Sequence, residues 1–183
     1  MVKKGKKKDW YIIMVSKPFN KEITKAMAEE PEKLIGRKIS VSLLELTNDF
    51  SKYYMKFIFK IKKVENGNAI AEFNGSECLQ DYISRMIVRR VRRIDVIQDL
   101  ETKDKVKIRV KSLVVVSKRV KSTMEKVIRK KVEEMMKDFV GNLTLEEFIQ
   151  KMISDEIKNK LIRVVSKIYP VRYFEIRKTE VLS

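Results

Sequence analysis

The sequence has 183 residues, and its 42 lysines and arginines against 25 acids give a formal net charge of +17. Repulsion among so many positive charges opposes a compact state unless an anionic partner neutralises it, which indicates a nucleic acid or an anionic membrane surface. Because the chain holds no histidine and one cysteine, it excludes catalytic triads, histidine-containing metal sites and multi-cysteine zinc sites. We therefore expect no cofactor and no metal, and no membrane span, since no run of about 18 apolar residues occurs.

The chain begins with a lysine-rich segment, which we interpret as a basic arm over residues 1–9. It is either a solvated tail or an arm that binds phosphates, and its candidate RNA-binding residues are Lys3, Lys4, Lys6, Lys7 and Lys8. Trp10 and Tyr11 follow. Because apolar residues continue through Ile12–Met14, we predict that both aromatic side chains pack into the core rather than stack on a base.

Alternating apolar and polar residues predict strands over most of residues 10–118. At Met55–Ile61 every second residue is apolar and most of the others are lysines. Asn66-Gly67 then gives a strong signal for a hairpin turn, because both central positions of that turn need a positive φ. Val106–Val110 repeats the alternation. Short strands separated by turns indicate a β-barrel domain over residues 10–118.

Helical patterns occur once within this domain and dominate after it. The spacing of apolar residues predicts a helix near residues 78–92. Ser122 and Thr144 each precede a glutamate by three residues, which is the capping-box pattern that begins a helix. The fold class is therefore α+β: an N-terminal β-barrel with an inserted helix, followed over residues 119–183 by a helical segment that ends in a strand.

The sharpest functional signal is a group of five arginines, without an acid among them, at Arg85, Arg89, Arg90, Arg92 and Arg93. At 100° per residue, Arg85, Arg89 and Arg92 share one side of the predicted helix. Arg90 falls on the apolar side, so either the helix ends early or Arg90 is buried against Asp95 or Asp99. A solvated helix face is the alternative, but such faces usually mix lysine with glutamate, and arginine alone favours bidentate contacts with phosphate.

Carboxylates offer the only other chemistry of note. Asp95, Asp99, Glu101 and Asp104 lie close together in the sequence and could hold Mg²⁺ as in a nuclease, with the three aspartates as the catalytic candidates. The favoured interpretation is that they cap turns and pair with neighbouring arginines. Cys78 is interpreted as a small buried apolar residue.

The sequence also resembles the small-subunit ribosomal protein family shared by archaea and eukaryotes that is known as S-three-A-e or e-S-one. The similarity runs in order along essentially the whole chain, and its segments are Trp10-Tyr11, Leu34–Arg37, Val41–Ile61, Ala71–Glu77, Asp81–Asp95, Thr102–Lys111 and Lys167–Leu182. Two departures occur, Val91 where the family usually has a third consecutive arginine, and Lys105 where it has a glycine. The chain lacks the long C-terminal extension of eukaryotic members, so it resembles the short archaeal type.

This resemblance implies a β-barrel beside a helical segment, located on the platform of the small ribosomal subunit near the messenger exit. It implies a cytoplasmic, non-enzymatic protein that binds ribosomal RNA and neighbouring small-subunit proteins, with messenger RNA near the exit as a further candidate partner. Two alternatives are a free RNA-binding barrel module that acts outside the ribosome and the carboxylate-metal nuclease.

Overall fold

The structure is a computed structural model that describes residues 8–65 and 67–182. The chain divides into two compact units, one that reaches Gly75 and one that starts at Ser76. The domain bounds predicted at residues 9 and 118 stay predictions. No helix within the described ranges has both the length and the apolar character needed to cross a membrane.

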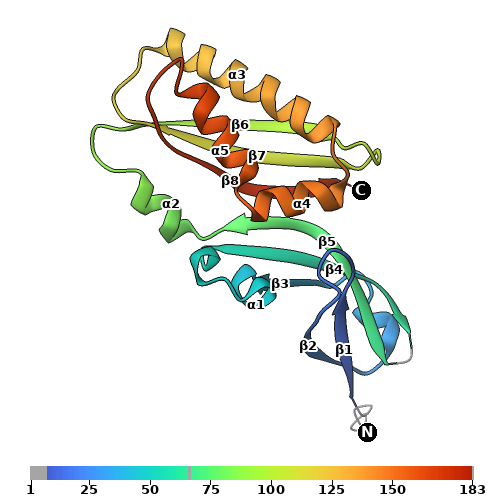
Figure 1. The fold of residues 1–183 in the computed structure, drawn as a ribbon. Coiled ribbons are helices and arrows are strands. Elements are labelled where there is room, and N and C mark those ends of the chain that lie inside the picture. Colours follow the sequence, from blue (N-terminus) through green and yellow to red (C-terminus); the bar gives the residue numbers. More distant parts are fainter. Residues whose placement is uncertain (1–7, 66, 183) are drawn as a thin grey trace, which may run out of the picture. The chain divides into compact units, whose positions relative to one another are not determined.

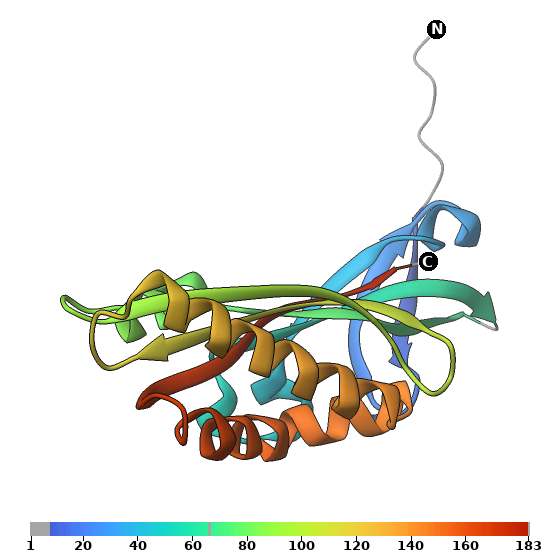
Figure 2. The same cartoon turned by 90° about the horizontal axis from the view of Figure 1, so that it is seen from above.

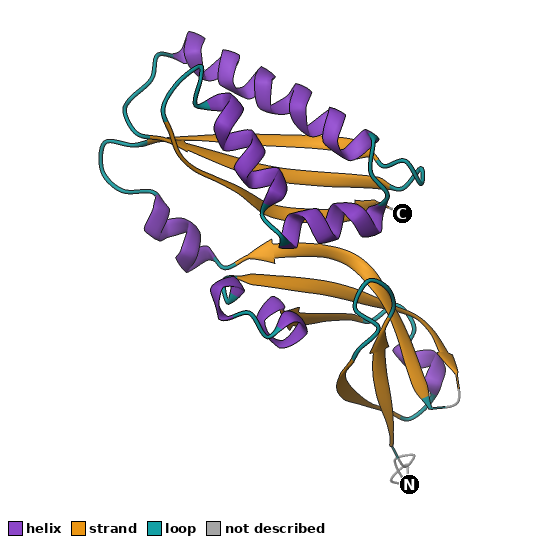
Figure 3. Ribbon diagram, viewed as in Figure 1, coloured by secondary structure: helices purple, strands orange, loops and turns teal. Residues whose placement is uncertain are grey.

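The first unit is built mainly from strands (Figure 3). Its strands follow the hydrogen-bonded order β2-β1-β5-β4-β3, in which β1 runs antiparallel to β2 and parallel to β5. The elements are β1 (Asp9–Val15), β2 (Glu22–Ala28), η1 (Pro31–Leu34), β3 (Lys38–Ser42), α1 (Leu43–Thr47), η2 (Phe50–Lys52), β4 (Met55–Glu65) and β5 (Asn68–Cys78), whose last residues belong to the second unit.

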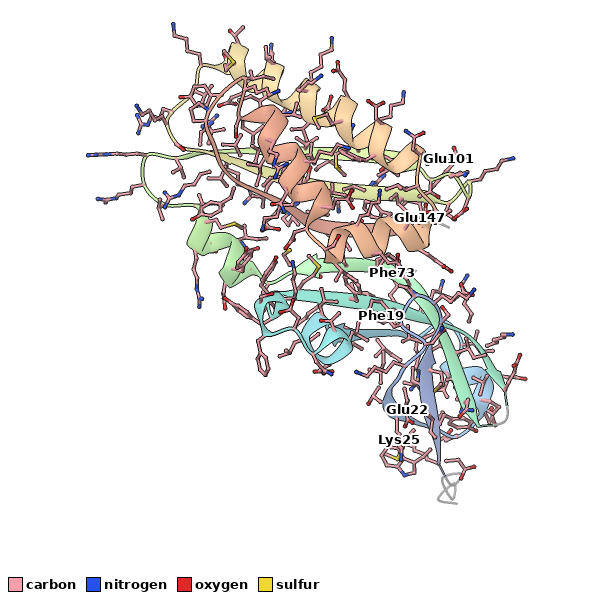
Figure 4. The ribbon with its side chains drawn as sticks, viewed as in Figure 1. Phe19, Glu22, Lys25, Phe73, Glu101 and Glu147 are labelled. Carbon is pink, nitrogen blue, oxygen red and sulfur yellow. The ribbon has the colours of Figure 1, made fainter. Side chains whose placement is uncertain are left out.

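Aromatic side chains form the centre of the first unit. Phe57 and Phe59 project from β4, and both are essentially inaccessible to solvent. Their rings meet those of Phe73 and Phe19 edge to face, with the centroids of Phe57 and Phe73 5.3 Å apart. Figure 4 labels Phe19 and Phe73. The alternation predicted for Met55–Ile61 is therefore confirmed, with Phe57 and Phe59 on the core face and the lysines pointing away.

Trp10 does not pack into this core, so that prediction is wrong. Its side chain is 63% exposed, whereas Ile13 and Val15 of the same strand are buried. Successive side chains of a strand point to opposite faces, so the parity that buries Ile13 turns Trp10 outward. Tyr11 shares the parity of Ile13 and is half-buried.

The predicted hairpin is formed by β4 and β5, which pair with each other and are connected by a turn of two residues. Asn66 lies outside the described residues, but Gly67 has a φ of 79°, in the left-handed region that glycine adopts readily. A Cβ added at Gly67 would meet no atom within 4 Å. The demand for glycine at this position is therefore conformational and not steric.

We expect Gly67→Val to lower the free energy of unfolding by about 1–3 kcal/mol, because a β-branched residue is strained at positive φ. Urea titration would measure the loss. RNA affinity should stay unchanged, because the turn has a structural role. A variant with normal stability and weakened RNA binding would contradict this interpretation.

The second unit combines a sheet with a layer of helices. Figures 1 and 2 show α3, α4 and α5 on one face of the β6–β7–β8 sheet. Along α3 the buried residues Ile128, Val132, Met136 and Val140 recur every four positions, as expected for a helix that packs along one stripe. The elements are α2 (Gln80–Met86), β6 (Arg92–Glu101), β7 (Lys107–Val116), α3 (Ser122–Gly141), α4 (Leu145–Ile153), α5 (Glu156–Val165) and β8 (Val171–Leu182).

The α+β class and the C-terminal strand are confirmed, but the predicted barrel is not. The eight strands form one mixed sheet with the order β2-β1-β5-β8-β7-β6, from which β4 and β3 branch at β5, and the sheet does not close on itself. β7, which the prediction placed in the barrel, pairs along its length with β6 and with the C-terminal β8. Period-two alternation marks a half-buried strand in either architecture, so the sequence pattern could not separate them.

Candidate nucleic-acid interface

The predicted arginine helix is shorter than the sequence pattern indicates. α2 ends at Met86, so only Arg85 lies on it, in its last turn. Arg89 and Arg90 lie in the turn that follows, and Arg92 and Arg93 begin β6. The predicted shared helical face of Arg85, Arg89 and Arg92 is therefore wrong. Pairing of β6 with β7 over ten consecutive residues buries Ile94 and Val96, and this tertiary gain outweighs local helical periodicity.

Of the two alternatives given for Arg90, the early helix end is confirmed, because α2 ends at Met86 and Arg90 is exposed rather than buried against an acid. Arg90 adopts a φ of 70°, which turns the chain from the end of α2 into β6. The acids proposed as its partners are bound to other arginines. Asp95 accepts from Arg93 at 2.6 Å, and Asp99 receives two hydrogen bonds from Arg109, at 2.6 and 2.7 Å.

These ion pairs support the interpretation that the carboxylates pair with neighbouring arginines and do not bind a metal. The guanidinium of Arg109 holds the pKa of Asp99 below its usual range. Asp104 accepts a hydrogen bond from the backbone N–H of Leu145 at 3.0 Å, at the first residue of α4. Within residues 8–65 and 67–182, no three carboxylate or cysteine side chains are grouped so that they could hold a metal ion.

The arginine turn forms one wall of a cavity of about 500 Å³. The opposite wall is the segment that leads into α3, so two stretches far apart in the sequence face each other. The β6–β7 register explains this, since it pairs Arg92 with Val116 and so places the start of one strand beside the end of the next. The cavity is lined by Arg90, Val91, Arg92, Arg119, Val120, Ser122 and Glu125.

The electrostatics of this cavity favour an anion. Three arginines line it against a single acid, Glu125, which accepts from Arg92 at 2.5 Å and so fixes that guanidinium in place. α3 starts at the cavity, and its 20-residue macrodipole adds partial positive charge there. The N-cap residue, Lys121, makes no side-chain capping bond, so the capping box predicted for Ser122 is wrong: Glu125 binds Arg92 instead. The second box, at Thr144 and Glu147, is confirmed.

Arg119 is the residue that sequence reasoning missed. It is exposed, and no ion pair involves it in the part of the chain that the structure describes. The signal was present in the run Lys118-Arg119-Val120-Lys121, which carries three bases in four residues. We define the arginine cavity as the surface formed by Arg90, Arg92, Arg119 and the first turn of α3.

Most of the predicted basic arm lies outside the described residues. This part includes Lys3, Lys4, Lys6 and Lys7, whereas Lys8 is exposed just before β1.

Cys78 is buried as predicted, and its thiol donates to the backbone oxygen of Ile176. Burial raises the pKa of that thiol to about 12, which suits an unreactive structural residue.

An exposed cavity of arginines at a helix start, on a strongly basic α+β protein, is the arrangement expected of a protein that binds polyanions. The comparison with known proteins makes the class specific: the chain belongs to the Ribosomal S3Ae family, which it matches over residues 1–183. This is a family of ribosomal proteins and not of enzymes.

Archaeal relatives match this chain along most of their own length. A protein of Methanopyrus kandleri named small ribosomal subunit protein eS1 is 35% identical over 98% of this chain and 88% of its own. The protein of the same name from Methanothermobacter thermautotrophicus is 34% identical over 97% of this chain and 92% of its own. The protein of the same name from Methanococcus vannielii is 34% identical over 97% of this chain and 81% of its own.

Proposed function

We propose that this protein is a structural constituent of the small ribosomal subunit that binds ribosomal RNA through the arginine cavity. The relatives named above support the subunit, and the cavity supports the mode of binding. The observation that carries the proposal is the convergence of Arg90, Arg92 and Arg119 at the start of α3.

The cavity suits recognition of an RNA backbone. An arginine guanidinium presents a planar fork that meets two phosphate oxygens at once, and it keeps its charge at any physiological pH. Double-stranded RNA is recognised chiefly by shape and by phosphate and ribose contacts. Such contacts position the protein without reading base sequence. The protein would therefore act architecturally, as one part of an assembled particle.

The location that we propose within the small subunit rests on the family resemblance. We propose the platform near the messenger exit, in the cytoplasm, with neighbouring small-subunit proteins as partners and messenger RNA as a further candidate. The alternative, a free RNA-binding module, differs in a measurable way. Sedimentation of a native lysate should place almost all of the protein in small-subunit fractions, and a slowly sedimenting free pool would favour the alternative.

The test of the cavity is the double variant Arg90→Gln/Arg119→Gln, measured against a hairpin RNA over about 50–200 mM salt. Each lost phosphate contact should reduce the slope of log affinity against log salt by about 0.7–0.9, and two should reduce it by about 1.4–1.8. The thermal midpoint should be unchanged, because both side chains are exposed and neither forms an ion pair within the described ranges.

The matched control is Arg37→Gln/Arg163→Gln, which removes the same charge from exposed positions elsewhere. Its slope should remain close to that of the unmodified protein. Equal slopes for the two double variants would show that net charge, and not the cavity, governs RNA binding.

A further inference from the structure

The outer edge of β6 is an unpaired strand edge. β6 pairs with β7 over ten consecutive residues without a register shift, and within the described ranges it has no strand on its other side. Such an edge presents a row of backbone N–H and C=O groups to any extended chain that approaches it. Long regular edges therefore either carry features that block pairing or serve as interfaces.

Another edge strand of the sheet, β2, shows such blocking features. β2 loses register with β1 between Ile13 and Met14, and it carries the exposed Lys25, which Figure 4 labels. A bulge and an edge lysine both discourage pairing. The C-terminal half of β6 has no bulge and no lysine, and it holds the apolar Ile97, whose side chain is 58% exposed.

A groove of about 830 Å³ runs along this edge. One side is formed by β6 from Ile97 to Glu101, and the other by the C-terminal half of α3. Figure 4 shows Glu101 at the end of β6, near the C-terminal end of α3. Gln98 holds the two sides together by donating to the backbone oxygen of Glu133 at 3.1 Å.

The groove is acidic although the chain carries a charge of +17. Four carboxylates line it, from Asp99, Glu101, Glu133 and Asp138, against one lysine, Lys137. Asp99 is neutralised by Arg109, but none of the other three carboxylates forms an ion pair among residues 8–65 and 67–182.

Asp138 adds a negative charge near the C-terminal end of α3. It lies in the last turn of α3, which contains no basic residue, and a helix C-terminus carries partial negative charge. An acid at that position is unfavourable unless a cation comes near it. The carboxylate and the helix end therefore act together on the same side of the groove, and both favour a positively charged ligand.

We propose that the β6 edge from Ile97 to Glu101 receives an extended, lysine- or arginine-rich segment of another protein as an added strand. Backbone hydrogen bonds to β6 would supply affinity, and the carboxylates on both sides would select basic side chains. The proposal does not depend on RNA binding, because the groove and the arginine cavity share no residue.

The experiment uses the full-length protein and a dye-labelled peptide of about seven alternating lysine and valine residues, a length that covers the edge at about 3.3 Å per residue. Fluorescence anisotropy at low salt measures binding. The double variant Glu101→Gln/Asp138→Asn should bind the peptide at least about tenfold more weakly, because two charge contacts are lost that low salt screens only weakly. Its thermal midpoint should not fall.

Two controls identify the mode of binding. The variant Glu32→Gln/Glu146→Gln removes the same charge from exposed acids outside the groove and should bind normally. The same peptide N-methylated along its backbone keeps its charges but cannot pair with a strand, so it should not bind.

Several results would overturn the proposal. They are absence of peptide binding, equal binding of the N-methylated peptide, and equal weakening in the control variant. A concentration-dependent dimer in analytical sedimentation that β6 variants abolish would assign the edge to a second copy of the chain. Loss of hairpin-RNA binding in Glu101→Gln/Asp138→Asn would assign the groove to RNA.

Discussion

Replacing Lys158 by methionine is expected to lower the free energy of unfolding by about 3–5 kcal/mol near neutral pH. Lys158 in α5 forms an ion pair with Glu175 of β8, and Tyr82 donates to the same carboxylate at 3.0 Å. Glu175 is 3% exposed, so the substitution leaves a buried carboxylate with no cation beside it. Removing one partner of a buried pair is far more damaging than replacing both.

The loss should depend on pH in a definite direction. Burial raises the pKa of Glu175 above its usual value, and Lys158 acts against this rise. Without Lys158 the folded-state pKa must rise further above the unfolded one, so the folded variant takes up a proton more readily than the unfolded chain. The deficit should therefore be largest at neutral pH and shrink as the pH falls through the folded-state pKa of Glu175.

Urea titrations near pH 7 and near pH 5 would measure both effects. Lys126→Met removes a lysine from an exposed position of α3 and should change stability by less than about 0.5 kcal/mol. The double variant Lys158→Met/Glu175→Leu should regain most of the lost stability, because no buried charge remains. A deficit in Lys158→Met that is the same at both pH values would show that packing, and not the buried charge, is responsible.

The sequence predicts the elements of this fold better than their partners. The β4–β5 hairpin, the helices after residue 121 and the final strand follow from local periodicity, from the turn residues of the hairpin and, for α4, from its capping box. The open sheet does not, because β7 pairs with β8, whose partner residues lie 55 to 75 positions later in the chain. Periodicity shows that a strand has one buried face, but it does not show which strand lies beside it.

The candidate site shows the same limit. The five arginines between positions 85 and 93 are conspicuous as a cluster in the sequence. The helical spacing predicted for them is wrong because α2 ends at Met86. The approach of Arg119 to Arg90 arises from the β6–β7 hairpin, which joins positions that are distant in sequence. When β6 and β7 pair along their whole length, the segment before β6 and the segment after β7 lie side by side, and both are rich in arginine or lysine. The site could therefore be predicted from the hairpin, but not from a helical face.

The second large effect is expected in the core of the first unit, where Phe57→Ala should lower the free energy of unfolding by about 3–5 kcal/mol. Phe57 is 0% exposed, and its ring meets three others edge to face. Truncation removes the buried apolar surface, leaves a cavity that the strands cannot collapse to fill, and deletes the ring contacts. Because the chain's one tryptophan, Trp10, lies in β1, its fluorescence anisotropy during a urea titration reports whether this unit is ordered.

Phe50→Ala provides the matched control, since it makes the same chemical change seven residues earlier in the same unit. Phe50 is 80% exposed, so its truncation removes little buried surface and should change stability by less than about 0.5 kcal/mol. If the two variants lost similar stability, the aromatic cluster would not be the centre of the first unit. If Phe57→Ala shifts the tryptophan-detected transition but leaves a later transition seen by circular dichroism, the second unit retains its structure when the first has unfolded. Its helices and its β6–β7–β8 sheet would then be stable through their own packing.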